Sequence, residues 1–264
     1  MDSHCHLDFD AFAHDRPAVV ERARRAGVGR ILNPGVDLES SRQAVRLSEE
    51  YPEVYAAVGV HPNEAAGWDK AAYAQLKELA AHPKVVAVGE IGLDFYRERA
   101  AHEIQRKTFR QQLELAAEMG LPVVIHTRSA TGSDHPAMEE ALVILAEVAD
   151  SRANGSGCRG VFHSYSADLV RAGRAIELGF SLGFTGPVTY NNAHQMQQLV
   201  AELPLEALLV ETDAPFLTPQ PQRGKRNEPA FVRLVAEKVA NLQVKSFDEV
   251  AKISTQNATR LFQW

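Results

Sequence analysis

Short runs of apolar and β-branched residues recur along the chain, and a longer stretch with helical periodicity follows each one. These apolar runs do not alternate strictly with polar residues, which indicates strands that are buried on both faces. Strands that alternate with helices predict a parallel sheet with right-handed crossovers. The runs occupy residues 29–33, 54–60, 85–89, 122–126, 160–163, 180–184 and 208–212, and we take the opening residues 1–6 as an eighth strand.

The stretches between these runs are predicted helices. Pro17 stands near the start of the first one and Gly27 follows its end, as expected for a helix start and stop. The fourth places Phe109 and Leu113 on one face. The predicted helices cover residues 17–27, 39–50, 69–81, 103–120, 136–149, 167–178, 193–202, 229–241 and 247–262.

Eight strand-helix units favour a closed α/β barrel of the (β/α)₈ TIM type over an open sheet. Seven steps carry the chain from His6 to Asp213, at about 30 residues per step, which suits one βα unit. No linker divides the chain, so we expect a single barrel domain over residues 1–264, with residues 150–159 as an extended loop. Only three residues precede His4, which is short for a barrel strand.

The composition limits the possible partners. Apolar residues make up 45% of the chain, which is enough for a large core. The net charge of -6 leaves no global basic field, so a nucleic-acid partner would be held by a local patch or by metal ions. The two cysteines suit a reducing cytosol, and we expect a cytoplasmic protein. No apolar run approaches the roughly 18 residues of a membrane span, and a single barrel predicts a monomer.

Polar side chains with metal-binding chemistry stand at the ends of the predicted strands. In a barrel of this type, the active site lies at the C-terminal ends of the strands. Four histidines and two carboxylates are therefore expected to converge on one end of one barrel. They are His4 and His6 on the first strand, Glu90 on the fourth, His126 on the fifth, His163 on the sixth and Asp213 on the eighth.

The types and spacing of these residues indicate a centre for two metal ions. His4 and His6 are two apart on a strand and so share a face. Imidazoles bind transition metals, and six ligands exceed the roughly three of a catalytic zinc. They suit two divalent ions about 3.5–4 Å apart. We assign His4, His6 and Asp213 to one ion, and Glu90 as the bridge. The other ion is assigned to His126 and His163.

Each histidine also has a plainer interpretation. A single buried histidine is more often a hydrogen-bonded core residue than a ligand, and only the convergence of six residues favours the metal centre. His61 ends the third strand without a matching carboxylate, so we expect it to contact phosphate or to support a ligand. The remaining histidines are interpreted as surface or capping residues; they are His14, His82, His102, His135 and His194.

Six motifs follow one another over nearly the whole chain: "DSHCHLDF" (2–9), "GVHP" (59–62), "GEIGLDFY" (89–96), "PVVIHTR" (122–128), "ETDAP" (211–215) and "RGKRNEP" (223–229). In this order they resemble the TatD family of metal-dependent hydrolases. The resemblance implies a (β/α)₈ barrel and a two-metal DNase, often a 3′→5′ exonuclease on single strands, with Mg, Mn or Zn. The family's ligand positions carry over onto the same six residues. "FHSYSAD" (162–168) departs from the usual His-Cys-Phe pattern, which leaves the substrate preference near it open.

The expected chemistry is hydrolysis of a phosphodiester by an activated water, with Asp213 as ligand and base and Glu90 as the bridging carboxylate. Three further cations at the rim are candidates for phosphate contacts, although a solvated basic turn would look the same. Phe95, Tyr96 and Phe216 could stack on bases or pack under the loops. The rim cations are Arg223, Lys225 and Arg226, and Arg128 is a fourth candidate.

Two other classes of function stay open. Related barrel hydrolases act on amides or lactones, and many bridge their metals with a modified lysine at the end of strand four. Glu90 occupies that place, and Lys84 lies at the wrong end of the strand. An aminoacyl-tRNA ester deacylase would use the same ions on a nucleic-acid ester. A non-catalytic binding protein is the second class, and a set of six intact ligands disfavours it.

Overall fold

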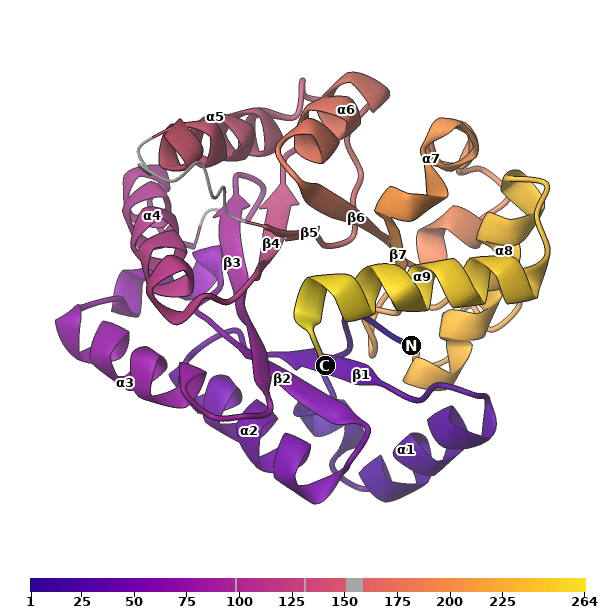
Figure 1. Ribbon diagram of the computed structural model, residues 1–264, viewed down its shortest axis with the longest axis horizontal. Coiled ribbons are helices and arrows are strands. Elements are labelled where there is room, and N and C mark those ends of the chain that lie inside the picture. The colour runs from indigo at the N-terminus through magenta and orange to yellow at the C-terminus, as the bar shows by residue number, and fades with distance from the viewer. Residues whose placement is uncertain (98, 131, 151–158) are drawn as a thin grey trace.

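A computed structural model describes residues 1–97, 99–130, 132–150 and 159–264 (Figure 1). Seven strands form one parallel sheet in chain order. Apart from its two ends, the loop predicted at 150–159 lies outside the described residues. The strands are β1 (Ile31–Pro34), β2 (Val54–Val58), β3 (Val85–Asp94), β4 (Val123–Arg128), β5 (Gly160–Phe162), β6 (Phe180–Phe184) and β7 (Leu208–Val210).

The N-terminal segment lies between β7 and β1 and closes the barrel. The amides of Asp2 and Cys5 donate to carbonyls of Arg30 and Leu32, at 2.9 Å each. On the other side, the amides of Ser3 and His6 donate to carbonyls of β7 and of the residue after Asp213, at 3.3 and 2.8 Å. The expected eighth strand is therefore present only as isolated bridges, because residues 1–6 supply too few consecutive pairs for a ladder.

Nine α-helices within the described residues surround the sheet or cap it. Their bounds agree with the predicted ranges to within three residues. The largest difference is at residue 229, where a 3₁₀ turn (Pro229–Phe231) precedes the last-but-one helix. The helices are α1 (Arg16–Arg25), α2 (Leu38–Glu50), α3 (Lys70–Ala80), α4 (His102–Met119), α5 (Pro136–Asp150), α6 (Leu169–Glu177), α7 (His194–Glu202), α8 (Val232–Leu242) and α9 (Phe247–Phe262).

The apolar residues form an inner core and an outer layer. Val124, Val161 and Leu209 pack inside the barrel against the end of α9, where Phe262 is buried. Figure 1 shows α9 crossing one end of the barrel, so that helix closes the end opposite the strand C-termini. The outer layer lies between sheet and helices, and Phe109 of α4 is buried there as its helical spacing predicts. No helix among the described residues is long and apolar enough to cross a membrane.

The inner core sets the direction of the functional side chains. Successive side chains of a strand point to opposite faces, so residues two apart share a face. Val124 packs inside the barrel, and His126 follows two residues later. Val161 and His163 repeat this relation at β5. The register that buries the apolar core therefore also points these histidines into the barrel mouth.

Candidate metal centre

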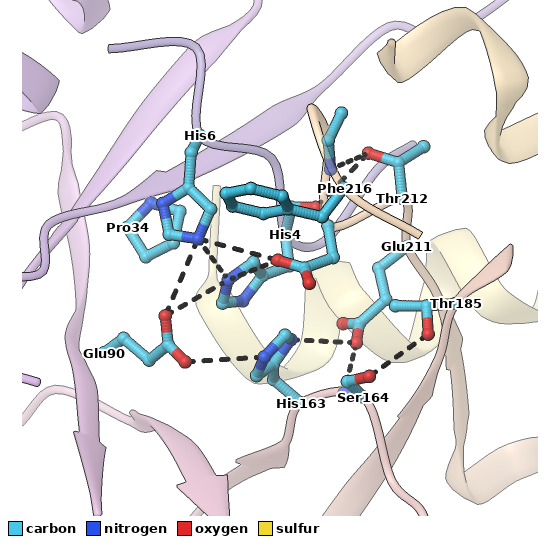
Figure 2. A network of polar contacts seen from close by, with 12 residues as sticks. His4, His6, Pro34, Glu90, His163, Ser164, Thr185, Glu211, Thr212 and Phe216 are labelled. Atoms are coloured by element: carbon cyan, nitrogen blue, oxygen red, sulfur yellow. Dashed lines mark hydrogen bonds and ion pairs between the residues drawn. The ribbon is translucent and has the colours of Figure 1, made fainter. Parts of the chain in front are cut away.

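The six predicted ligands meet at the C-terminal end of the barrel. The N-terminal segment supplies His4 and His6, while β3 supplies Glu90 (Figure 2). His126 lies on β4, His163 directly follows β5, and Asp213 lies on the turn after β7. Side-chain burial is nearly complete for His4 and Glu90 at 0% and 4% exposure, and His126 is the most open at 16%. The centre is thus a buried polar cluster that opens on one side.

Glu90 lies between two pairs of histidines. Its Oε2 atom is 3.4 Å from His4 Nε2 and 3.6 Å from His6 Nε2. Its Oε1 atom is 2.8 Å from His126 Nδ1 and 3.4 Å from His163 Nε2. Burial alone would raise the pKa of Glu90, but the surrounding histidines outweigh it and hold that pKa well below its usual range. One ionised carboxylate therefore presents a different oxygen to each pair.

We call His4, His6 and Asp213 the first half-site. The Nε2 atoms of the two histidines are 3.2 Å apart, and Asp213 Oδ1 lies 3.7 and 3.6 Å from them. Burial opposes a charge on His6, yet Asp213 and Glu90 raise its pKa to about 9. Asp213 has a left-handed φ of 54°, a strained backbone conformation for a residue other than glycine. Its amide donates to the carbonyl of His4 at 2.8 Å, which ties the two ligands together.

We call His126 and His163 the second half-site, and each of its imidazoles has a carboxylate behind it. His163 Nδ1 is 3.2 Å from Glu211 Oε1, and His126 Nε2 is 3.4 Å from Asp94 Oδ2. Asp94 and Glu211 were not assigned from the sequence, although both stand in the quoted motifs "GEIGLDFY" and "ETDAP". Carboxylates behind metal-binding histidines orient the ring and increase its basicity.

Two glycines allow this close arrangement. A Cβ atom at Gly183 of β6 would lie 2.4 to 2.6 Å from the Glu211 carboxylate. Gly92 of β3 has a φ of 138°, and a Cβ there would lie 2.1 Å from the His126 carbonyl oxygen. Any larger residue would displace Glu211 or the backbone of His126, so both positions require glycine.

A buried carboxylate, Asp2, also anchors the first half-site, and no local sequence pattern separates it from surface acids. Asp2 accepts hydrogen bonds from the Thr212 amide at 2.9 Å, the Thr212 hydroxyl at 2.6 Å and the His4 amide at 3.3 Å. Burial raises the pKa of Asp2 to about 7. Asp2 thereby joins the backbones that carry His4 and Asp213, which lie far apart in the chain.

The residues of the centre fit divalent metal ions. The Nε2 atoms of His4 and His6 lie 3.2 Å apart, and Asp213 Oδ1 lies 3.6 to 3.7 Å from both. Imidazole nitrogens and a carboxylate that converge in this way can share one divalent ion. Three groups have ligand atoms within 4.8 Å of one another: His4, His6 and Asp213; His61, Glu90 and His126; and His4, His163 and Glu211. The first is the predicted first half-site. Imidazole and carboxylate together suit zinc or manganese.

The other histidines divide as follows. His61 Nε2 lies 3.8 Å from Glu90 Oε1, and its ring meets the His126 ring edge-on at 4.4 Å. Burial lowers the pKa of His61 to about 3, so it stands neutral beside the centre. His102 and His194 each begin a helix, and none of the remaining three lies in the candidate metal groups of the described residues.

The predicted phosphate-binding cations differ in their surroundings. Arg128 lies over the ring of Tyr96 at 4.3 Å, and Arg223 lies over Tyr190 at 4.5 Å. Both arginines are exposed. Lys225 is exposed as well, and its Nζ donates to a glutamine of the same turn at 2.9 Å.

Arg226 is engaged in a different contact. Its guanidinium makes two hydrogen bonds to Asp15, at 2.7 and 2.8 Å, and lies 4.6 Å from the centre of the Phe12 ring. This pairing holds the pKa of Asp15 at about 2. The aromatic candidates also differ: Phe95 stacks on His102 at 3.9 Å, whereas Phe216 and Tyr96 are each 53% exposed.

Comparisons with known proteins show the family and the fold. The family model described as "TatD related DNase" matches residues 1–263. An uncharacterized metal-dependent hydrolase of Bacillus subtilis, YabD, is 41% identical over all of this chain and 98% of its own. A Pantoea vagans protein named 3′-5′ ssDNA/RNA exonuclease TatD is 37% identical over 96% of this chain and 95% of its own. The crystal structure of the Escherichia coli TatD homologue YjjV superposes with a TM-score of 0.88, at 33% identity, over 100% of this chain and 97% of that one.

Proposed function

Since the chain belongs to the TatD-related DNase family and is a metal-dependent hydrolase, we propose that it hydrolyses phosphodiesters of single-stranded DNA from the 3′ end with two divalent ions. The position of Glu90 carries this proposal. Its two oxygens face two separate histidine pairs, as a carboxylate that bridges two ions would. The name of the Pantoea relative supports a single-stranded nucleic-acid substrate.

The protein residues divide the work as follows. His4, His6 and Asp213 would hold one ion, His126 and His163 the other, and Glu90 both. When bound, such a pair supplies Lewis acidity and lowers the pKa of water. Mg, Mn and Zn are all candidates.

Proton transfer is the task of Asp213. Its carboxylate is 15% exposed at the mouth of the centre, and the nearby histidines keep its pKa below the usual value despite burial. An ionised carboxylate there can orient the attacking water and accept its proton. The neighbouring His4 and His6 keep that carboxylate in place through contacts of 3.6 to 3.7 Å.

The substrate is held at the rim. Arg128 ends β4, and Arg223 and Lys225 lie on the loop after β7; all three are exposed cations that can contact phosphates. His61, neutral beside Glu90, can donate a hydrogen bond to a phosphate oxygen. Arg226 instead braces the rim through Asp15, and its guanidinium reaches phosphate only if that pair opens. We propose a monomer, because the site needs no residue from a second chain.

The test uses single-stranded oligonucleotides labelled at the 3′ or the 5′ end, with Mg, Mn or Zn supplied in turn. The 3′ label should be released first, as a mononucleotide. Asp213→Asn has the same shape but cannot accept a proton, so it should abolish hydrolysis while circular dichroism stays unchanged. Asp248→Asn, on the exposed start of α9, is the matched control. Wild-type protein that cleaves esters or lactones but no oligonucleotide with any metal would contradict the proposal.

A further inference from the structure

A cleft of about 890 Å³ opens beside the first half-site, between the N-terminal turn and the start of α2. Asp8, two residues after His6, lines one wall, and Pro215, two residues after Asp213, lines another. The ring of Phe9, also in the wall, stacks on the His6 imidazole with centroids 4.5 Å apart. The cleft therefore adjoins the proposed reacting centre, and its volume lies within the range of small-molecule sites.

One wall of the cleft is aromatic. Phe216 is 53% exposed, and its ring meets Phe9 edge-on at 6.0 Å. In Figure 2 the Phe216 side chain lies on the His6 side of the centre. Its backbone is held at both ends: the amide donates to the Asp213 carbonyl at 2.9 Å, and the carbonyl accepts from the Asn227 amide group at 2.6 Å. A large apolar ring kept in solvent by a rigid backbone is suited to stacking on a base.

The lining of the cleft is also rich in acidic residues. Among the described residues that line the cleft, Arg16 is the only lysine or arginine, and its Nε already donates to the Leu7 carbonyl at 2.6 Å. Carboxylates accept hydrogen bonds from sugar hydroxyls and repel phosphate. The exposed cations of the rim line no part of this cleft. The acidic residues are Asp8, Asp10, Asp37 and Glu39. Glu39 also pairs with Arg42 and Arg46 of α2, at 3.3 and 3.0 Å, so Asp8, Asp10 and Asp37 supply most of the negative charge.

We propose that this cleft is a terminal-nucleoside pocket, in which the last base stacks on Phe216 and the free 3′-hydroxyl faces the carboxylates. The inference rests on the proposed nuclease function and deepens it. An acidic wall admits a 3′-hydroxyl but disfavours a 3′-phosphate or a continuing strand. The negative charge of the pocket would thus restrict cleavage to strand ends and make the enzyme an exonuclease. The rest of the strand would lie along the basic part of the rim.

The binding test does not depend on turnover. Calorimetry on the metal-loaded protein compares 5′-dAMP with deoxyadenosine 3′,5′-bisphosphate, which differs only by the 3′-phosphate. Wild type should prefer 5′-dAMP by about tenfold or more, as expected for repulsion between like charges near a surface. Asp10→Asn combined with Glu39→Gln should reduce this preference, and Phe216→Ala should weaken both ligands. Asp248→Asn and Val244→Ala, at exposed positions outside the cleft, are matched controls that should behave as wild type.

The cleavage test uses three single-stranded DNAs: one with a 3′-hydroxyl, one with a 3′-phosphate and one circular. Only the first should be degraded rapidly. Equal binding of the two nucleotides, together with equal cleavage of all three DNAs, would overturn the pocket. A different result would separate the two proposals: no DNA is cleaved, but wild type still prefers 5′-dAMP and the variants lose that preference. This result would overturn the nuclease function and support the pocket as a nucleotide site.

Discussion

The two half-sites of the centre are built in different ways. His126 and His163 stand on β4 and directly after β5, within strand pairing that also buries the inner core. His4 and His6 stand on a segment that makes only isolated bridges, and Asp213 lies in a strained turn after β7. The second half-site is therefore oriented by regular sheet register. The first half-site forms only when the N-terminal segment pairs with the turn that follows β7.

The supporting contacts differ accordingly. Carboxylates back the imidazoles of the second half-site directly, through Asp94 and Glu211. In the first half-site, Nδ1 of His4 and of His6 has no hydrogen-bond partner, and support comes from Asp2 through the backbone. We therefore expect the first half-site to depend more on the metal itself.

The largest effect is expected at the residue that the half-sites share. Glu90→Gln keeps the shape of the side chain but removes the charge between the two histidine pairs, so both ions should bind weakly. Activity should fall to background, and elemental analysis should show loss of metal from both half-sites. Glu114→Gln on the exposed face of α4 is the control. If the Glu90→Gln protein retained two ions, Glu90 could not be assigned as the bridge between them.

Single ligand deletions should separate the half-sites. His4→Ala and His6→Ala should each lose the same ion, because their Nε2 atoms are only 3.2 Å apart. His126→Ala should lose the other ion. Elemental analysis after gel filtration should give about one equivalent of metal in each variant. Unchanged metal content in both His4→Ala and His6→Ala would refute the first half-site.

Removing a backing carboxylate should have a smaller and selective effect. Glu211→Gln keeps an oxygen for the Ser164 amide but weakens the orientation of His163. Metal affinity of the second half-site should drop about 10- to 100-fold, with the first little changed. Competition with a chelator measures both affinities. Equal losses at the two half-sites would show that Glu211 supports the whole centre rather than His163.

The smallest effect on activity is expected at Asp2. The two carboxylate oxygens of Asp2 accept hydrogen bonds from the Thr212 amide and hydroxyl. Asp2→Asn leaves only one side-chain oxygen to accept them. The lost hydrogen bond at this buried position should lower the free energy of unfolding by about 1–3 kcal/mol. Saturating metal should widen this deficit, because a ligand stabilises the state it binds and the variant, with a less well anchored first half-site, should bind the metal more weakly. Thermal unfolding with metal and with a chelator tests this, and an equal deficit in both conditions would contradict a role at the metal centre.

Much of the fold was predictable from local pattern, and so was the convergence of the six candidate ligands at one end of the barrel. The alternation of apolar runs and helices predicts the barrel, and the family comparison and the observed sheet confirm it. Ligands at strand ends follow from the architecture, since parallel strands all end at the same side. The prediction of a regular strand at residues 1–6 was wrong. This segment makes only isolated bridges to its two neighbours, whereas a ladder needs several consecutive pairs.

The supporting residues were not predictable in the same way. Asp94 and Glu211 look like any carboxylate near a strand end until a histidine from another strand is placed beside them. Arg226 stands in a basic run with Arg223, yet of these two arginines it is Arg226 that pairs with Asp15. Such pairings join residues far apart in the chain, and no local pattern encodes which of several acids a cation will reach.

By itself the sequence determined the repeating units, their order and the chemistry at each strand end, because those depend on periodicities of two and of 3.6 residues. The pair of histidines in "MDSHCHLDF" could be placed on one face by that rule alone. The tertiary structure decided how the barrel closes, which oxygen of Glu90 faces which histidines, and which side of the centre is acidic. These features arise only when distant segments meet, because charge and hydrogen-bond complementarity depend on distances across the fold and not on spacing along the chain.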